Sequence, residues 1–283
     1  MIKVLLIFTV FLLALIGYWF ASGRKREVLH FETIENGLMH IASQTSHQRV
    51  DFSELAALPK PVERYFRKVL VDGQPSVQTM RCWQAGVIRG SIKSSRWSEF
   101  QAQQLIVPSA PGFVWNARVD TPFGTFVQVV DSYLQGEGAG RVSLLAALTV
   151  AQDSNHPMIN ASALHRYLAE AVWCPTALLP SAGIVWRAID DFTALATIND
   201  DANSVSVEFR FDDHGDIVGV FSPGRYGLFE GEYKQVAWEG RYFDYQQIEG
   251  MRVPLAGEVG WYDGDELKLV WSGRLSKIQF SFS

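Results

Sequence analysis

The side chains best suited to chemistry lie together between residues 160 and 174. His165, Arg166, Glu170 and Trp173 all occur in this segment, which reads NASALHRYLAEAVWC. A glutamate whose pKa is raised by an aromatic wall can act as a general acid, and an arginine can hold a carboxylate or a phosphate. The segment has the pattern of a helix, on which Arg166 and Glu170, four positions apart, would pair with each other. We favour this structural interpretation and assign no catalytic residue.

Most of the nine tryptophans fall in different segments that favour β-structure. If they lie on one concave face of a sheet, they would line an apolar cavity. They could equally fill a solid hydrophobic core, and both outcomes stay open. The tryptophans concerned are Trp83, Trp97, Trp115, Trp186, Trp238, Trp261 and Trp271. We name His165, Arg166, Glu170, Trp173 and Trp115 as the candidate ligand-binding residues.

Established catalytic and metal-binding motifs are missing from the sequence. It contains no G-x-S-x-G, P-loop or H-E-x-x-H pattern. The glycine-rich residues 136–140 join two predicted strands and therefore lack the helix N-terminus that holds a phosphate. The acidic residues 212–216 suit a hairpin turn better than a metal site. Cys82 and Cys174 match no zinc spacing, and they could form a disulfide or remain buried thiols. We expect no cofactor and no metal.

Charge argues against a nucleic-acid partner. The net charge is −5, and the only basic run is residues 24–26. Binding to phosphate backbones needs a basic face. The basic run instead has the position of a membrane flank.

Residues 2–22 predict a single transmembrane helix. As a helix they are about 31 Å long, which matches a hydrocarbon core of about 30 Å. Lys3 is their only charge, and residues 24–26 end the span. A cleaved signal peptide is the alternative, although the basic residues directly after the cleavage position disfavour it. The positive-inside rule tilts the following domain towards the cytoplasm by a margin of about one charge, so its side of the membrane stays open.

The remaining chain predicts a juxtamembrane helical segment over residues 23–52 and one β-rich domain over residues 53–283. A short helix capped by Ser53 and a second one from Pro61 precede the strands. One longer helix, capped by Asn160 or Ser162, interrupts them. The predicted strands are 77–90, 96–107, 113–120, 124–136, 184–190, 193–199, 204–211, 216–221, 232–247, 252–261 and 266–280; residues 141–151 suit a strand or a helix.

Short turns between these segments indicate antiparallel neighbours, and the absence of helical crossovers argues against a parallel sheet. We therefore expect a mainly β (α+β) fold. It would consist of a large curved antiparallel sheet or half-barrel with one or two helices packed on or in it.

Four stretches carry a resemblance: LPKPVERYF at 58–66, PGFVW at 111–115, RYLAEAVWCPTALLP at 166–180 and FRFDDHG at 209–215. Together they resemble a widespread bacterial family of membrane-anchored proteins known only as a domain of unknown function. That family has no established activity, so no catalytic residue carries over. More loosely, the expected shape resembles the lipoprotein-carrier fold, a curved sheet with helices plugging its hollow, which implies lipid binding by analogy alone.

Three functions follow from these features. The first is a binding module that holds a lipid or other hydrophobic ligand near the bilayer. The second is a protein-interaction or envelope-maintenance module that docks a partner on an exposed sheet face or edge. The third is an enzyme that uses Arg166 and Glu170. We favour the first function because of the membrane anchor, the aromatic strands and the missing catalytic motifs. Its partner would be the bilayer and its ligand a hydrophobic small molecule, and no protein partner is identified.

Overall fold

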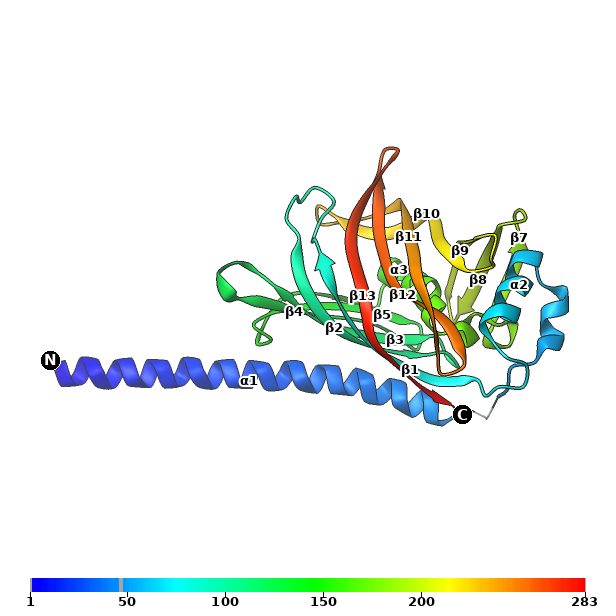
Figure 1. Cartoon of the computed structure of the whole chain (residues 1–283). Helices are drawn as coiled ribbons and strands as arrows, with labels where there is room; N and C mark the ends of the chain where they lie inside the picture. Colours follow the sequence, from blue (N-terminus) through cyan, green and yellow to red (C-terminus); the bar gives the residue numbers. More distant parts are fainter. Residues whose placement is uncertain (1, 46–47, 283) are drawn as a thin grey trace.

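A computed structural model describes residues 2–45 and 48–282, and one large curved sheet dominates it (Figure 1). Within the described residues the sheet has thirteen strands, and all neighbours in it are antiparallel. The strands are β1 (Val77–Ile88), β2 (Ser98–Val107), β3 (Gly112–Asp120), β4 (Phe126–Leu134), β5 (Glu137–Leu144), β6 (Leu148–Ser154), β7 (Ile184–Ala188), β8 (Thr193–Asp200), β9 (Asn203–Phe211), β10 (Ile217–Phe229), β11 (Glu232–Ile248), β12 (Met251–Asp263) and β13 (Glu266–Phe282). The sheet curls into a half-barrel, which confirms the predicted fold class.

The order of the strands is that of two meanders joined along one seam. From β6 to β1 and from β13 to β7, each strand pairs with its neighbour in the chain. The seam is the pairing of β1 with β13, which places Val77 opposite Phe282. The edge strands are therefore β6 and β7, which follow each other along the chain.

Tight turns at polar or glycine residues separate the strands. Gly264, with φ +62°, makes the turn between β12 and β13, because a residue without a side chain adopts this conformation readily. The segment 141–151, whose structure the sequence left open, forms the end of β5 and the start of β6. Leu145 and Ala146, both with positive φ, break it into two strands.

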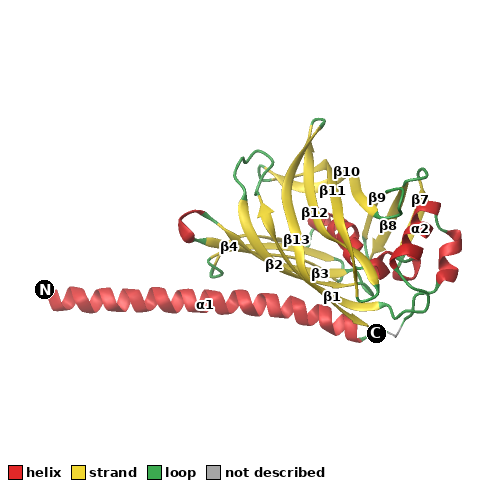
Figure 2. Ribbon diagram, in the orientation of Figure 1, coloured by secondary structure: helices red, strands yellow, loops and turns green. Residues whose placement is uncertain are grey.

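Helix α3 (Pro157–Glu170) connects the two edge strands across the concave side of the sheet (Figure 2). It contacts β4 and β5 on one side and β9 and β10 on the other. Three short 3-10 helices follow it: η3 (Ala171–Trp173), η4 (Pro175–Leu178) and η5 (Pro180–Ala182). The predicted caps were wrong. His156 caps the helix, because its ring accepts a hydrogen bond from the Ile159 N–H, whereas Asn160 accepts one from the Gly138 N–H of β5.

The helices before the sheet pack at one end of the half-barrel. They are η1 (Phe52–Ala57) and α2 (Lys60–Val69), the latter starting with Pro61 in its first turn as expected. Asp51 caps η1 through a hydrogen bond to the Ser53 N–H, so Ser53 is not the cap. Tyr65 of α2 is fully buried and packs on the ring of Phe211 at 5.9 Å. Aromatic side chains therefore contribute to the packing at this end.

Helix α1 (Ile2–Ser43) is uninterrupted, so one helix contains the predicted transmembrane segment and residues 23–43 of the predicted juxtamembrane segment. Its second half packs on the convex face of the sheet, where Leu38 is fully buried beside Leu105 and Val114. An ion pair of 2.8 Å joins Glu27 to Arg141. The apolar first half extends away from the sheet, is exposed, and is long and apolar enough to cross a membrane. The proposed boundaries at residues 22 and 52 stay a prediction.

Both cysteines are buried on the concave side of the sheet and free. Their environment raises the pKa of each thiol to about 12 through burial. The two open alternatives are thus resolved in favour of unpaired thiols.

Candidate functional site

A cavity of about 230 Å³ lies in the hollow between α3 and the sheet. Its walls come from both meanders and from the helical segment between them. The residues around it are Gln84, Ile88, Trp115, Asp131, Arg166, Glu170, Trp173, Arg225, Trp238, Tyr242, Glu258, Val259, Trp261, Val270 and Trp271. Five of these are tryptophans and one is a tyrosine, so aromatic rings are the most frequent kind of side chain in the wall.

The aromatic wall is built on the end of the helix and on three long strands. The Trp173 ring of η3 lies 6.2 Å from Tyr242 of β11 and 6.5 Å from Trp271 of β13, measured between centroids. The Tyr242 hydroxyl donates to the Ala169 carbonyl at 2.7 Å and ties this strand to α3. Trp238 and Trp261, from β11 and β12, are paired directly across the ladder. Inward positions of neighbouring strands therefore meet in one continuous aromatic surface.

A cluster of charges forms the opposite side of the cavity. The Arg166 guanidinium donates through Nε to Glu170 Oε1 and through Nη1 to Asp131 Oδ2, both at 2.8 Å. It also lies over the ring of Trp115 at 4.8 Å. Arg166 thus joins its own helix to β3 and β4, and both of its carboxylate partners are fixed by it.

A chain of amides extends this cluster into the sheet. Gln104 donates to Glu170, Gln84 donates to Gln104 at 2.7 Å, and the Trp115 indole donates to Gln84 at 2.9 Å. Gln84 and Gln104 are buried and lie diagonally across from each other on β1 and β2, because Gln84 pairs with Ala102 and Gln104 with Cys82. These bonds satisfy polar groups that would otherwise be costly to bury.

Burial and neighbouring charges shift the ionisation of this cluster. Burial raises the pKa of Asp131, and the Arg166 charge opposes that rise. For Arg166, burial disfavours the cation, but Glu170 and Asp131 outweigh it and leave the pKa raised. Arg166 therefore carries a permanent positive charge that is neutralised within the protein.

A second arginine at the cavity, Arg225, is not neutralised in this way. A bulge in β10 directs it inward. Ser222 pairs with Trp238 and Arg225 with Val236, so β10 has one more residue than β11 between these two pairs. The guanidinium lies 4.7 Å from the Trp238 ring and 5.3 Å from the Trp261 ring. Burial, followed by repulsion from Arg166, lowers its pKa to about 10.

The hydrogen-bond donors of this region are incompletely used. Arg225 Nη2 reaches the Ser162 carbonyl at 3.3 Å, and within the described chain Arg225 takes part in no ion pair. Its Nε atom is buried without a partner among the described residues, and so are the indole nitrogens of Trp173 and Trp238. All three line the same cavity.

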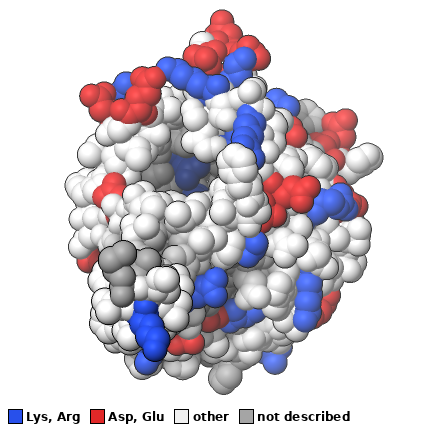
Figure 3. All heavy atoms as spheres, turned by 90° about the vertical axis from the view of Figure 1, so that its left-hand side faces the viewer, with Lys and Arg blue, Asp and Glu red and all other residues white. Residues whose placement is uncertain are grey.

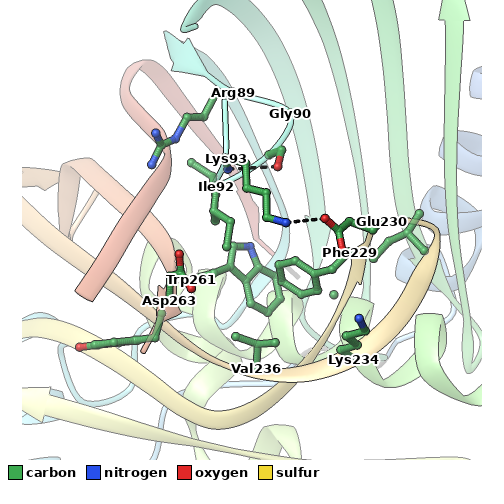
Figure 4. Close-up of a pocket in the computed structure, with 15 residues that line it drawn as sticks. Arg89, Gly90, Ile92, Lys93, Phe229, Glu230, Lys234, Val236, Trp261 and Asp263 are labelled. Atoms are coloured by element: carbon green, nitrogen blue, oxygen red, sulfur yellow. Dashed lines mark hydrogen bonds and ion pairs between the residues drawn. The ribbon is translucent and has the colours of Figure 1, made fainter. Parts of the chain in front are cut away.

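An outer pocket of about 420 Å³ continues from this cavity and shares Trp261 and Val270 with it. Figure 4 shows Trp261 at its base, with Phe229 beside it and an ion pair between Lys93 and Glu230 above. Together the two spaces fall within the range of about 300–1,000 Å³ that small-molecule sites occupy. Figure 3 shows a hollow on the face from which α1 extends, with basic atoms in its depth.

The structure brings together four of the five candidate residues, Trp115, Arg166, Glu170 and Trp173, around the cavity. His165 does not line it. Its ring is buried between α3 and β10, with Nδ1 3.0 Å from the Ala161 carbonyl and Nε2 3.4 Å from the Ser222 hydroxyl. The role of all five in binding a ligand stays a prediction.

Asp131, Tyr242 and Arg225 also line the cavity and were not predicted from the sequence. Asp131 and Tyr242 give no local signal, because their inward position depends on the register of the sheet. Arg225 does have one: it follows Pro223 and Gly224, which lie between the predicted strands 216–221 and 232–247, and a proline or glycine near a strand often marks a bulge.

No metal centre is found in the described part of the chain, where no three His, Cys, Asp or Glu side chains converge. The acidic segment at 212–216 is the turn between β9 and β10. Asp212 Oδ1 accepts hydrogen bonds from the N–H groups of His214 and Asp216, and Asp216 is ion-paired with Lys68 and Arg252. The hairpin interpretation of this segment therefore agrees with the structure.

A family model described as a family of unknown function, DUF6544, matches residues 48–273. No curated protein matches the chain. Similar solved structures include a LolA superfamily protein from Nitrosomonas europaea (8% identity, TM-score 0.42, covering 80% of this chain and 94% of that one). A DUF1329 family protein from Desulfovibrio piger is similar as well (9% identity, TM-score 0.39, covering 87% and 92%). These likenesses say nothing of ligands.

Proposed function

Since this chain belongs to the DUF6544 family of unknown function, we propose from its own geometry that it binds a lipid or other hydrophobic ligand beside the bilayer. The single observation that carries the proposal is the cavity with five tryptophans in its wall. Apolar walls with a few polar groups at fixed positions are typical of small-molecule sites.

The position of α1 supports a location next to the membrane. Gly23 lies against the turn between β5 and β6: a Cβ atom added there would be 2.3 Å from the Ala147 carbonyl oxygen. The sheet thus begins where the apolar first half of the helix ends. We infer that residues 2–22 remain attached as a single-pass anchor, which would hold the domain at the bilayer surface.

A second apolar feature lies on the same side of the domain. The 3-10 helix η2 (Pro122–Gly124) forms the tip between β3 and β4, and Phe123 there is fully exposed with a φ of +62°. Figure 2 shows this tip projecting in the direction of the N-terminal end of α1. An aromatic side chain at such a tip suits the interface of a bilayer.

The pairing of Arg166 and Glu170 supports a binding role over a catalytic one. Each group has partners within the protein, whereas a catalytic acid or base must be available to a substrate. The cluster therefore suits a fixed polar wall that orients a ligand.

Photoaffinity labelling tests the proposal with the full chain in lipid nanodiscs. The probe is a neutral long-chain alcohol with a diazirine in its chain, and mass spectrometry locates the labelled residues. We expect labels on the inner faces of β11–β13 as well as on residues 2–22, which report contact with the bilayer. Labelling confined to residues 2–22 would refute an internal site.

A matched pair of variants provides the control. Val259→Phe fills part of the cavity and should lower labelling of β11–β13 severalfold. Val218→Phe makes the same change on the exposed face of β10 and should leave labelling unchanged. Equal effects of the two would mean that the label enters from the surface and not through the cavity.

A further inference from the structure

The unused polar groups at the cavity are all hydrogen-bond donors. They are Arg225 Nε and the indole nitrogens of Trp173 and Trp238. Both tryptophans are 3% exposed, so bulk water is a poor substitute partner. Buried donors of this kind are costly unless an acceptor meets them. A ligand that complements this site must therefore supply acceptor oxygens.

The charge of Arg225 narrows the class of ligand further. Arg166 is neutralised by two carboxylates at 2.8 Å, whereas Arg225 has one backbone carbonyl at 3.3 Å. A cation that lies over two indole rings is stabilised in part by their faces, but its Nε–H group still lacks an acceptor. An oxygen that carries negative charge forms the stronger bond to a guanidinium.

The other charged groups around Arg225 do not replace such an anion. Asp131 and Glu170 are bound to Arg166. Glu258 is joined to Arg241 at 3.4 Å. The carboxylates of the wall are thus directed to other arginines, and Arg225 is left with its donor free.

From these contacts we infer that the cavity receives an acyl chain whose head group is anionic, with the head bound by Arg225, Trp173 and Trp238 and the chain extending along Trp261. This inference rests on the proposed function and names its ligand class. A carboxylate fits the small inner cavity of about 230 Å³. The outer pocket, which shares Trp261 and Val270, provides the path for the chain.

The experiment compares three diazirine probes with one chain length in nanodiscs that contain the full-length protein. Their head groups are a carboxylate, a phosphate monoester and a hydroxyl. For each probe, labelling of β11–β13 is divided by labelling of residues 2–22. This ratio corrects for differences between the probes in how strongly they partition into the bilayer. We expect the carboxylate probe to exceed the alcohol by about tenfold or more, the effect of a charge-assisted hydrogen bond.

Variants assign the preference to Arg225. Arg225→Met should bring the carboxylate ratio down to that of the alcohol. Arg187→Met, which removes an exposed arginine of the edge strand β7, should preserve the preference. The comparison of probes on the unmodified protein needs no variant to fold, so it stands by itself if Arg225→Met is unstable.

Each outcome separates the two proposals. Equal labelling of the cavity by the acid, the phosphate and the alcohol would overturn the anionic head group and leave the hydrophobic site standing. No labelling of the cavity by any probe would overturn the proposed function as well. A phosphate signal above the carboxylate signal would support the anionic class and assign the head group to a phosphate.

Discussion

Replacing Arg166 by methionine tests whether the charged cluster is a structural joint of the molecule. Arg166 bonds Glu170 on its own helix and Asp131 on β4, both at 2.8 Å. The variant keeps most of the side-chain volume and removes the cation. Two carboxylates are then left at a largely buried site without a counter-charge, and the link between α3 and β4 is lost.

The expected size follows from the burial of the three side chains. Breaking a buried ion pair costs about 3–5 kcal/mol. The side chains here are 19% (Arg166), 17% (Glu170) and 35% (Asp131) exposed, so water relieves part of that cost. Lost contact with the Trp115 ring adds about 0.5–1 kcal/mol. We therefore expect the free energy of unfolding to fall by about 3 kcal/mol, a large part of the 5–15 kcal/mol or so typical of a domain.

Urea unfolding of the full chain in nanodiscs, followed by tryptophan fluorescence, measures the change. The surface pair Glu63 and Arg67 has the same i,i+4 spacing but is 34% and 48% exposed. Arg67 also lies over the Phe52 ring, so Arg67→Met should cost at most about 1 kcal/mol. Adding Asp131→Asn and Glu170→Gln to Arg166→Met should recover part of the lost free energy of unfolding, because the two unpaired carboxylate charges are removed. A loss from Arg166→Met no larger than that from Arg67→Met would refute the structural role.

Three further outcomes are expected. Burial lowers the pKa of His165 from 6.5 to about 4. As pH falls from 6.5 to 4, the unfolded chain binds a proton at this residue before the folded protein does, so the free energy of unfolding should fall by up to about 3 kcal/mol. Urea unfolding at several pH values should detect this loss in the unmodified protein and not in His165→Gln. Gly23→Ala should speed amide hydrogen exchange in the turn between β5 and β6, because its Cβ atom meets a backbone oxygen, whereas Gly17→Ala meets nothing within 4 Å and should not. Cys82 and Cys174 are buried, and burial raises their pKa, so a maleimide should modify them only in denaturant; modification of the folded protein would contradict the buried positions.

The sheet was predictable from sequence because each hairpin is a local event. Alternating apolar residues and turn residues such as Asp263–Asp265 mark a strand and its neighbour together, so the strand pattern and the antiparallel pairing could both be inferred. The pairing of β1 with β13 could not, since no turn joins them and their register depends on the closing of the whole sheet.

The candidate site was predictable only where helix spacing determines it. Arg166 and Glu170 pair at the expected distance of four residues, and Trp115 and Trp173 meet them because both lie on the concave side. His165 faces β10 instead, since a residue adjacent to Arg166 on a helix must point about 100° away. Arg225 was missed because its direction depends on a bulge, which shifts one strand by a residue relative to its partner.

The seam between β1 and β13 also constrains how the protein is made. During translation β1 emerges early, and its partner β2 follows within a few residues, but the opposite edge of β1 has no partner until β13 has been synthesised. Until then the first meander has an unpaired backbone edge, and such edges are prone to pair with the wrong chain. The packing of α1 on the convex face of β1 to β4 can hold this half-sheet in place from the start, so this helix would also act as a folding scaffold for the nascent chain.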